Sequence, residues 1–382
     1  MNFSYEGLRS MYPEKYDELM DLKEIAYGST KEHFLNYFPH SSKRENFVFE
    51  DHFILEEDKR IVTHVGLFPM EVIAGKSKVK VGGIGGVATH LNYQGKGYMG
   101  RLLKYSVEKM REREIPLSIL WGDTQRYRHF GWETAGRKIV FCLDQRSIKK
   151  VKVGKKFILK GYTDKVDLDK IMEIHEKEPL KVKRTKKDYE EKLKRTQIQI
   201  WMGNKENCSC YAVLNDNAVV EFGGEPSLVV ELFSFLLSHY PLNTLCVHYP
   251  YTDTEMLHYL YRVSSSWQIL PLGMIKVIDL KKTLLSFKSE IQENANIYGI
   301  SNGDFLTLKM KDSHQKASLI KKEGEIEVKD EELEEVVSLS DIEMVRLLFG
   351  PTPEEFGKNE KQKRFLKAVF PLNFYVWWLD HI

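Results

Sequence analysis

Two neighbouring stretches decide the fold of this chain: Val81-Gly-Gly-Ile-Gly-Gly-Val-Ala-Thr-His90 and Gln94-Gly-Lys-Gly-Tyr-Met-Gly100. The first is apolar and rich in glycine, which predicts a strand over 79–90 that is covered on both faces and bulged near Gly85-Gly86. The second predicts a loop that opens into a helix over 97–113. Small residues before a helix start leave backbone N–H groups and the positive end of the helix dipole open to an anion. The sequence therefore predicts a phosphate-binding loop. Three cations lie at its mouth: Lys96, Arg101 and Lys104.

The loop also satisfies a second phosphate-binding pattern. Gly95-Lys-Gly-Tyr-Met-Gly100 has the G-x-G-x-x-G spacing of dinucleotide-binding folds, and Asp123 follows about 20 residues later, as that pattern requires. In such folds the loop follows the first strand, whereas here about 90 residues with expected helices and antiparallel strands come first. An NAD-dependent oxidoreductase stays open as an alternative.

The loop in its mid-domain position resembles that of the GCN5-related N-acetyltransferases (GNAT), whose Arg/Gln-x-x-Gly-x-Gly/Ala loop grips the pyrophosphate of coenzyme A. Gln94-Gly-Lys-Gly-Tyr-Met99 fits this pattern except at its last place. A bulky apolar residue there is characteristic of the enhanced-intracellular-survival (Eis) branch. The turn Arg126-Tyr-Arg-His-Phe-Gly-Trp132 and the chain end Pro371–Ile382 resemble the same branch. The resemblance covers the whole chain and is strongest over 80–136.

The resemblance implies an α+β chain of three domains. Residues 1–145 would form a catalytic GNAT domain, with a mixed, mostly antiparallel sheet and flanking helices. Residues 150–285 would form a second, degenerate GNAT-like domain, because Gly223-Gly-Glu-Pro226 stands at the place of the phosphate loop and its glutamate would repel pyrophosphate. Residues 290–382 would form an α+β domain similar to sterol-carrier proteins, a structural label that implies no lipid ligand.

The resemblance also implies a set of cofactor contacts. Acetyl-CoA would be the co-substrate, and no metal is expected. The strand before the loop would bind the pantetheine arm through the backbone of Val87, Ala88 and Thr89. The other expected contacts are the loop residues and one glycine after the next strand: Gln94, Gly95, Lys96, Gly97, Tyr98, Met99, Gly100 and Gly122.

Two residues are expected to catalyse the transfer. Tyr127 would be the general acid that protonates the leaving thiolate, with a merely packed side chain as the alternative. The chain end 374–382 is strongly apolar, unlike the polar ends of most chains, so burying it would carry the carboxylate of Ile382 into the structure, where it needs polar partners. By resemblance that carboxylate is a base, and a terminal core strand is the alternative. Asp123 is expected either to orient the Tyr127 turn or to bind the acceptor.

These assignments predict an enzyme that transfers an acetyl group from acetyl-CoA to a primary amine in a ternary complex. The acceptor would be an aminoglycoside, a polyamine or a lysine-type amine, and the resemblance implies a homo-hexamer. A non-catalytic acyl-CoA-binding regulator is the alternative outside enzymology. Helices expected over 13–27 and 30–38 would either wall the acceptor site or only pack.

Composition limits the partners. The chain has 382 residues and a net charge of +2, so no strong field attracts nucleic acid. No run approaches 18 apolar residues, and the N-terminus lacks a basic stretch followed by an apolar one, so neither a membrane span nor a signal peptide is expected.

Four scattered cysteines indicate a reducing compartment, and the expected location is the cytoplasm. Cys208-Ser-Cys210 has no partner pair at zinc spacing. The basic linker 146–156 is expected to be a solvated connection.

Alternation and turn residues predict further elements of the first two domains. Separate strands are expected over 47–56, 60–66 and 70–73, with a closing strand over 132–143, and a strand over 267–278 is expected to complete the second domain. The helix over 13–27 is expected to bury one apolar face: Leu19, Leu22, Ile25 and Ala26.

Overall fold

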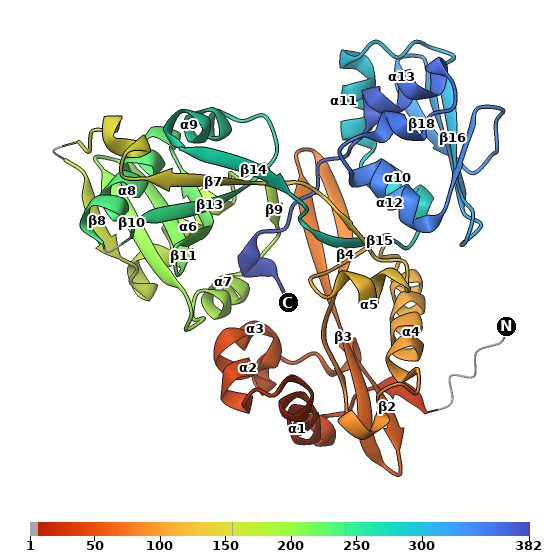
Figure 1. Ribbon diagram of the computed structural model, residues 1–382, viewed down its shortest axis with the longest axis horizontal. Helices are drawn as coiled ribbons and strands as arrows, with labels where there is room; N and C mark the ends of the chain where they lie inside the picture. Colours follow the sequence, from red (N-terminus) through yellow and green to blue (C-terminus); the bar gives the residue numbers. More distant parts are fainter. Residues whose placement is uncertain (1–6, 155, 241) are drawn as a thin grey trace.

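The computed structural model describes residues 7–154, 156–240 and 242–382 (Figure 1). Residues 1–6, the stretch expected to lack a signal peptide, and Lys155 of the basic linker lie outside the described residues.

The first sheet carries the glycine-rich strand at its centre. Its order is β1 (Leu8–Ser10), β2 (His52–Glu57), β3 (Arg60–Ala74), β4 (Ser77–Thr89), β5 (Leu117–Leu120), β15 (Gly273–Val277) and β6 (Glu133–Ala135), and β9 (Leu180–Val182) also pairs with β3. Its helices are α1 (Tyr16–Tyr27), α2 (Lys31–Tyr37), α3 (Pro39–Ser42), α4 (Tyr98–Glu112) and α5 (Thr124–Arg128). Alternation along β2 explains the layers: Phe53 packs with the α4 core and Ile54 packs with the α1 core, so these helices cover opposite faces.

The second sheet repeats this plan with different strands. Its order is β14 (Ser266–Leu270), β7 (Lys138–Asp144), β13 (Thr244–Pro250), β12 (Ala218–Gly224), β11 (Cys208–Asn215), β10 (Gln199–Lys205) and β8 (Ile158–Gly161). Its helices are α6 (Asp164–His175), α7 (Lys186–Lys192), α8 (Pro226–His239) and α9 (Glu255–Val263). In both sheets an antiparallel meander leads through a helix to a parallel strand, β4–α4–β5 in the first and β12–α8–β13 in the second.

The two sheets exchange strands. β7 follows β6 closely in the chain but pairs with β13 and β14 of the second sheet. β15 follows β14 closely but pairs with β5 and β6 of the first sheet. The single strands expected over 132–143 and 267–278 are therefore wrong, because each region is two strands in different sheets. The exchange also crosses the predicted limit between the first two domains, whose boundaries stay a prediction.

The C-terminal part is a smaller α+β unit. Its sheet has the order β18 (Glu325–Lys329), β17 (Lys316–Lys322), β16 (Phe305–Met310) and β19 (Val336–Leu339). Its helices are α10 (Leu280–Ser286), α11 (Lys288–Ile297), α12 (Asp341–Phe349) and α13 (Glu360–Val369).

Two other expectations near the site are corrected. The strands expected over 60–66 and 70–73 are one continuous strand, β3, because Pro69 pairs opposite Gly82 without interrupting the ladder. In α1, Ile25 is 45% exposed, whereas Lys23 is only 3% exposed. The helix thus buries a lysine where an apolar side chain was expected.

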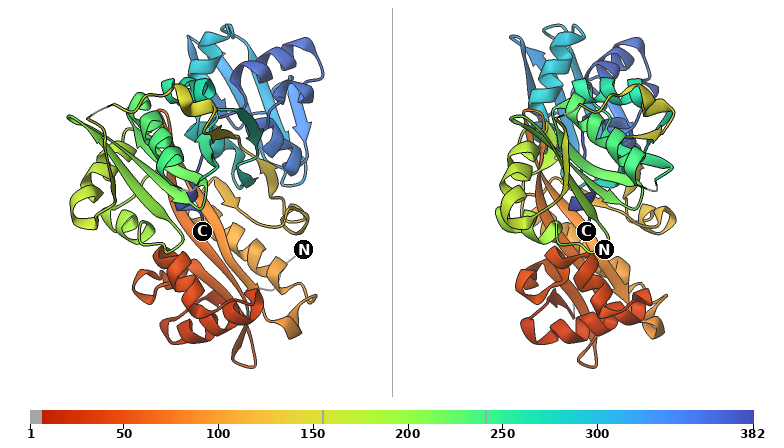
Figure 2. Two further views of the ribbon diagram at one scale, coloured as in Figure 1. Left: turned by 60° about the vertical axis from the view of Figure 1, so that its left-hand side comes forward. Right: turned by 90° about the vertical axis from the view of Figure 1, so that its left-hand side faces the viewer.

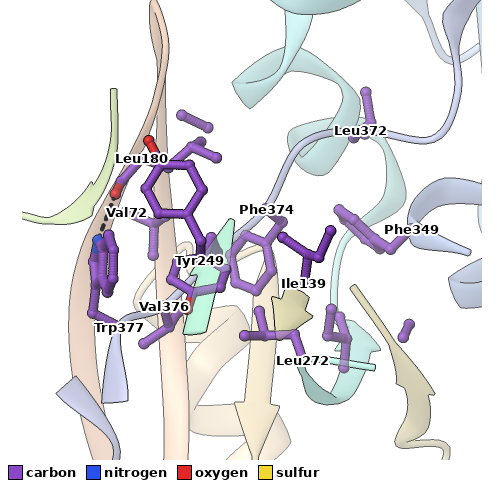
Figure 3. Packing of buried hydrophobic residues seen from close by; sticks show 14 of the residues in the cluster. Val72, Ile139, Leu180, Tyr249, Leu272, Phe349, Leu372, Phe374, Val376 and Trp377 are labelled. Atoms are coloured by element: carbon purple, nitrogen blue, oxygen red, sulfur yellow. Dashed lines mark hydrogen bonds between the residues drawn. The ribbon is translucent and has the colours of Figure 1, made fainter. Parts of the chain in front are cut away.

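The chain end crosses the molecule as an irregular segment. Residues 372–377 belong to no helix or strand, and a 3-10 turn, η7, spans Trp378–Asp380, so a terminal core strand is wrong. The segment is held by its side chains: Phe374 packs near Phe349, and Trp377 Nε1 donates a hydrogen bond of 2.9 Å to the carbonyl of Leu180 (Figure 3). The C-terminus ends beside β3 and β4 of the first sheet in both views of Figure 2.

Candidate active site

A cavity of about 820 Å³ lies where β4 ends and α4 begins. The cations expected at its mouth, Lys96, Arg101 and Lys104, line it together with Arg126. So do nearly all the expected cofactor contacts: Val87, Ala88, Thr89, Gln94, Gly95, Lys96, Gly97, Tyr98, Met99 and Gly100. The exception is Gly122, which lies outside this lining. The structure thus brings the predicted contacts together around one hollow of suitable size for a large ligand.

The loop presents an uncapped helix start to this cavity. Gly95 and Gly97 have φ angles of +78° and +77°, a region that side chains disfavour, which accounts for glycine at both places. Gly97 is the N-cap of α4, and no side chain caps the helix there. The first N–H groups of α4 are therefore left for a ligand, as an anion site requires.

The corresponding helix start in the second sheet is already filled. Glu225 is the N-cap of α8, and its carboxylate accepts hydrogen bonds from the N–H groups of Ser227 at 3.2 Å and Leu228 at 2.9 Å. A carboxylate of the chain thus occupies the position that a phosphate would take, which explains why this copy offers no phosphate loop.

Strand β4 parts from its parallel neighbour beside the cavity. Its pairing with β5 covers only Val81–Gly83 against Leu117–Ile119, although β4 continues to Thr89. A register shift between β3 and β4 places a bulge at Gly86, whose φ angle is +58°. Beyond the bulge, the hydroxyl of Tyr27 in α1 donates a hydrogen bond of 2.9 Å to the carbonyl of Val87.

Tyr127 lies in the short helix α5 and, unlike its neighbour Arg126, is not among the residues that line the cavity. The Asp123 carboxylate caps this helix by accepting from the N–H of Gln125 at 2.9 Å, so Asp123 orients the turn. A Cβ on Gly122 would come within 2.5 Å of the Tyr127 ring, so Gly122 is needed for ring packing rather than for lining the cavity. Tyr127 is 9% exposed, and burial raises the pKa of its phenol. The group therefore keeps its proton at neutral pH.

The terminal residue packs directly on β4. A Cβ on Gly83 would collide with Cδ1 of Ile382, and a Cβ on Gly85 would lie 3.3 Å from the Ile382 carboxyl carbon. The imidazole of His381 stacks on Trp121 after β5, with ring centroids 3.6 Å apart. The chain end thus packs against two glycines of β4 and against Trp121, which follows β5.

The second sheet clamps the same segment through buried charges, here called the tail clamp (Arg184, Lys192, Arg195, Glu221 and Asp380). The Arg184 guanidinium donates to both Asp380 oxygens at 2.8 and 2.7 Å and to both Glu221 oxygens at 3.0 and 2.5 Å. Arg195 donates to the carbonyls of Leu379 at 2.9 Å and His381 at 3.0 Å. Burial alone would raise the pKa of Asp380, but Arg184 and Lys192 outweigh burial and hold it below its ordinary value. Asp380 therefore stays ionised and fixes the tail.

A second cavity, of about 260 Å³, lies on the other side of the chain end. Ile382 lines it together with residues of the first sheet, among them His52 and Phe68, and with Arg184 of the clamp. The terminal residue therefore borders this smaller cavity and packs on β4, the strand that lines the larger one.

Sequence reasoning missed three residues of this region. Tyr27 and Lys23 are on α1, where their spacing indicated ordinary helix positions, and Arg184 belongs to a basic segment without a motif. One signal could have found Lys23: it follows Leu22 on the helix face that also carries Leu19. For Arg184 no local signal exists, because its partners lie 37 and 196 residues away.

The described residues contain no cluster of three or more His, Cys, Asp or Glu side chains that could hold a metal ion. Among the same residues, no helix has the length and apolar character needed to cross a membrane.

Comparisons with known proteins agree with this geometry. Residues 7–135 match the family described as an acetyltransferase (GNAT) domain. A probable N-acyltransferase of unknown function from Enterococcus faecalis V583 superposes with a TM-score of 0.75 at 16% identity, covering 98% of this chain and 99% of the other. A GCN5-related N-acetyltransferase from Kribbella flavida gives 0.73 at 16% identity, covering 98% of both chains. Eis1 from Mycobacterium abscessus gives 0.70 at 10% identity, covering 98% and 100%. A search of curated protein sequences finds no match.

The family match covers β4, the glycine loop and the Tyr127 turn, and the structural likeness extends over nearly the whole chain. The predicted fold class is therefore confirmed, and the dinucleotide-binding alternative is wrong. This chain carries a GNAT acetyltransferase domain over residues 7–135, is an acetyl-CoA-dependent N-acetyltransferase, and shares its fold with Eis1 over 98% of its length.

Proposed function

We propose that this protein transfers the acetyl group to a primary amine by direct attack in a ternary complex, with an aminoglycoside, a polyamine or a lysine-type amine as the acceptor. One observation carries the proposal: Ile382 packs on β4, a strand that lines the larger cavity, and Ile382 itself lines the smaller one. A volume of about 260 Å³ lies below the roughly 300–1,000 Å³ of drug-sized sites, which suits one amine-bearing arm of a larger acceptor.

The carboxylate of Ile382 is the base in this proposal. An alkyl amine has a pKa near 10.4 in water, so it arrives as an ammonium ion. A carboxylate attracts that cation and takes its proton, directly or through a water molecule, which frees the nitrogen lone pair for attack. The tail clamp supports this role because it fixes Asp380 and the carbonyl of His381, the residues just before the carboxylate.

The backbone of Val87–Thr89 binds the pantetheine arm and polarises the thioester carbonyl with an N–H group. The hydrogen bond from Tyr27 to the Val87 carbonyl supports this assignment, because it fixes the orientation of that peptide unit beyond the bulge. The loop Gln94–Gly100 binds the pyrophosphate at the uncapped start of α4.

Tyr127 is the acid that protonates the leaving thiolate. A free phenol is a weaker acid than a thiol by roughly 1.5 pKa units, a mismatch of about 2 kcal/mol. Burial raises the pKa of Tyr127 and enlarges this mismatch, but it also keeps the proton on the phenol until the thiolate forms. Positioning beside the reacting atoms can offset an energy of this size.

The wider assignment follows the same resemblance. The chain comprises a catalytic domain (1–145), a second GNAT-like domain without a phosphate loop (150–285) and a sterol-carrier-like domain (290–382). It acts as a cytoplasmic homo-hexamer on small-molecule or lysine-bearing amines. Sedimentation of the purified protein tests the hexamer directly.

The base is tested by changing only the terminal charge. A semisynthetic protein that ends in the amide of Ile382 keeps every side chain and loses the carboxylate. We expect kcat to fall at least 100-fold while the Kd of acetyl-CoA, measured by calorimetry, stays the same.

Tyr127→Phe should give the same pattern, and the surface variant Tyr298→Phe, at a residue that is 63% exposed, is the matched control. If the protein that ends in the amide of Ile382 keeps the wild-type kcat, the terminal carboxylate is not the base. Parallel lines in double-reciprocal plots of initial rate against acetyl-CoA, at several acceptor concentrations, would exclude a ternary complex.

A further inference from the structure

Lys23 lies against the bulge of β4. Its Nζ is 3.4 Å and its Cε 3.3 Å from the point that a Cβ on Gly86 would occupy. The side chain comes from the middle of α1, one turn before Tyr27, which holds the carbonyl of Val87. A buried amine thus borders the strand that lines the cofactor cavity.

The lysine has no counter-ion among the residues the structure describes. Its ammonium group lies over the rings of Phe34 and Phe47, at 5.9 and 6.0 Å from Nζ to the centroids. Only 3% of the residue is exposed, and burial lowers the pKa of its amine to about 8. Such a group is still mostly an ammonium ion at pH 7. A buried cation without a partner costs free energy of folding, and such costs concentrate at functional sites.

The groups packed around Lys23 supply no negative charge. His64 Nδ1 lies 2.7 Å from the carbonyl of Gly86, which can only accept, so this nitrogen carries a proton. His64 Nε2 then accepts from His52 Nδ1 at 2.9 Å. Burial lowers the pKa of both imidazoles, to about 3 for His64, so both stay neutral. The anion beside this part of β4 is the Ile382 carboxylate, which packs at the preceding residue, Gly85.

We propose that Lys23, as an ammonium ion, stabilises the negative charge that develops on the thioester carbonyl oxygen beside the β4 bulge. This inference rests on the proposed function. When the amine attacks, the new C–N bond forms and the carbonyl electron pair moves to oxygen. When that pair returns, the C–S bond breaks and the thiolate takes the proton of Tyr127. A fixed cation next to Gly86 stabilises the intermediate between these steps more than it stabilises the neutral thioester.

The absence of a counter-ion is what makes this role effective. A carboxylate next to Lys23 would cancel its field in the resting enzyme, whereas phenyl faces leave the field intact and exclude water. The attraction between the ammonium and the oxyanion is therefore poorly screened. The charge is in place before the substrates bind, so no reorganisation is needed during the reaction.

The test compares Lys23→Met, which keeps the length of the stem and removes the charge, with Lys31→Met on α2 as a control. Lys31 pairs with Asp21 at the surface and lies outside the site. We expect Lys23→Met to lower kcat by roughly 10- to 100-fold, somewhat less than the loss of a directly bonded oxyanion donor. The Kd of acetyl-CoA should stay the same. In the unliganded protein, the melting temperature should rise, because an unpaired buried charge has been removed.

The pH profile distinguishes this role from others. The kcat/KM of the wild-type enzyme should fall as the pH rises through about 8, the pKa of Lys23 in the unliganded protein, and this alkaline limb should be absent from Lys23→Met. NMR titration of lysine labelled with ¹³C at Cε locates the same pKa in the unliganded wild-type protein. A wild-type rate that rises through pH 8, with that rise lost in Lys23→Met, would indicate a neutral lysine acting as a base and overturn the proposal, as would an alkaline limb that is unchanged in Lys23→Met.

The outcomes also separate this inference from the proposed function. If Lys23→Met keeps full kcat while the amidated chain end and Tyr127→Phe lose it, the lysine has no catalytic role. If all three variants keep full kcat, the proposed chemistry itself is wrong.

Discussion

The carboxyl carbon of Ile382 lies 3.3 Å from the point at which a Cβ on Gly85 would sit. The last residue of the chain thus packs so close to a strand residue almost 300 positions earlier that a side chain at position 85 would press on it. The glycines of β4 predicted a strand covered on both faces and bulged near Gly85-Gly86. Gly83 and Gly85 make room for the chain end, whereas Gly86 forms the bulge.

Gly85→Ala should displace the chain end. Its Cβ would press on the main chain of Ile382 and on the Phe68 ring at 3.2 Å, and overpacking of this kind costs about 1–3 kcal/mol. We expect kcat to fall at least tenfold with little change in the Kd of acetyl-CoA. Gly83→Ala is the graded comparison, because its Cβ meets the movable end of the Ile382 side chain, and its effect should be smaller. If both variants have the same kcat as the wild type, the position of Ile382 on β4 does not affect the rate of acetyl transfer.

Gly97→Ala should weaken binding of acetyl-CoA. The φ angle of +77° is strained for alanine by about 1–2 kcal/mol, so the loop will shift and move the first N–H groups of α4. Gly75→Ala, at φ +57° in the turn between β3 and β4, carries a similar strain far from the cavity. Calorimetry should show a Kd raised about 5- to 30-fold for Gly97→Ala only. A raised Kd in both variants would indicate general destabilisation instead.

Arg184→Met should destabilise the protein and release the tail. It leaves Glu221 and Asp380 buried without their shared partner, which costs about 3–5 kcal/mol. Lys186→Met breaks the exposed pair with Asp169 and should cost under about 1 kcal/mol. Urea unfolding measures both variants. If Arg184→Met and Lys186→Met have nearly the same free energy of unfolding, the tail clamp does not hold the chain end in place.

Local patterns were enough to predict the glycine loop and the helix that follows it. The glycines of Gln94–Gly100 and the helix after them are neighbours in sequence, so the phosphate loop could be predicted from local spacing alone. The Tyr127 turn was expected from the resemblance to the Eis branch, and Asp123 caps its helix, which is one of the two roles expected for Asp123.

Long-range pairing set the limit of sequence reasoning. The exchange of β7 and β15 between sheets depends on which strand edge is open, and no residue within either strand encodes that choice. The chain end was correctly expected to be buried, but its apolar side chains fill gaps between the sheets instead of alternating along a strand. Lys23 was missed because a lysine at a helix position is normally solvated, although its spacing from Leu19 puts it on the buried face of α1, where it lies against the bulge at Gly86.

Lys23 also predicts how stability changes with pH. Its pKa is about 8 in the folded protein against 10.5 for an unperturbed lysine. Between these pH values the unfolded chain binds more protons than the folded one, so the free energy of unfolding rises with pH. Below pH 8 the folded protein carries the full penalty, about 3 kcal/mol for the difference between these two pKa values.

Lys23→Met should therefore be more stable than the wild type by about 3 kcal/mol at pH 7, because it removes this penalty. The gain should shrink as the pH rises from 8 and should reach a constant value above 10.5, where both the folded and the unfolded chain carry a neutral amine. Lys31→Met, whose amine is exposed, should show no such decline. Urea unfolding at pH 7, 9 and 10.5 measures the difference. A gain that stays the same across this range would mean that the folded protein and the unfolded chain bind the Lys23 proton equally, so that burial does not lower the pKa of this amine.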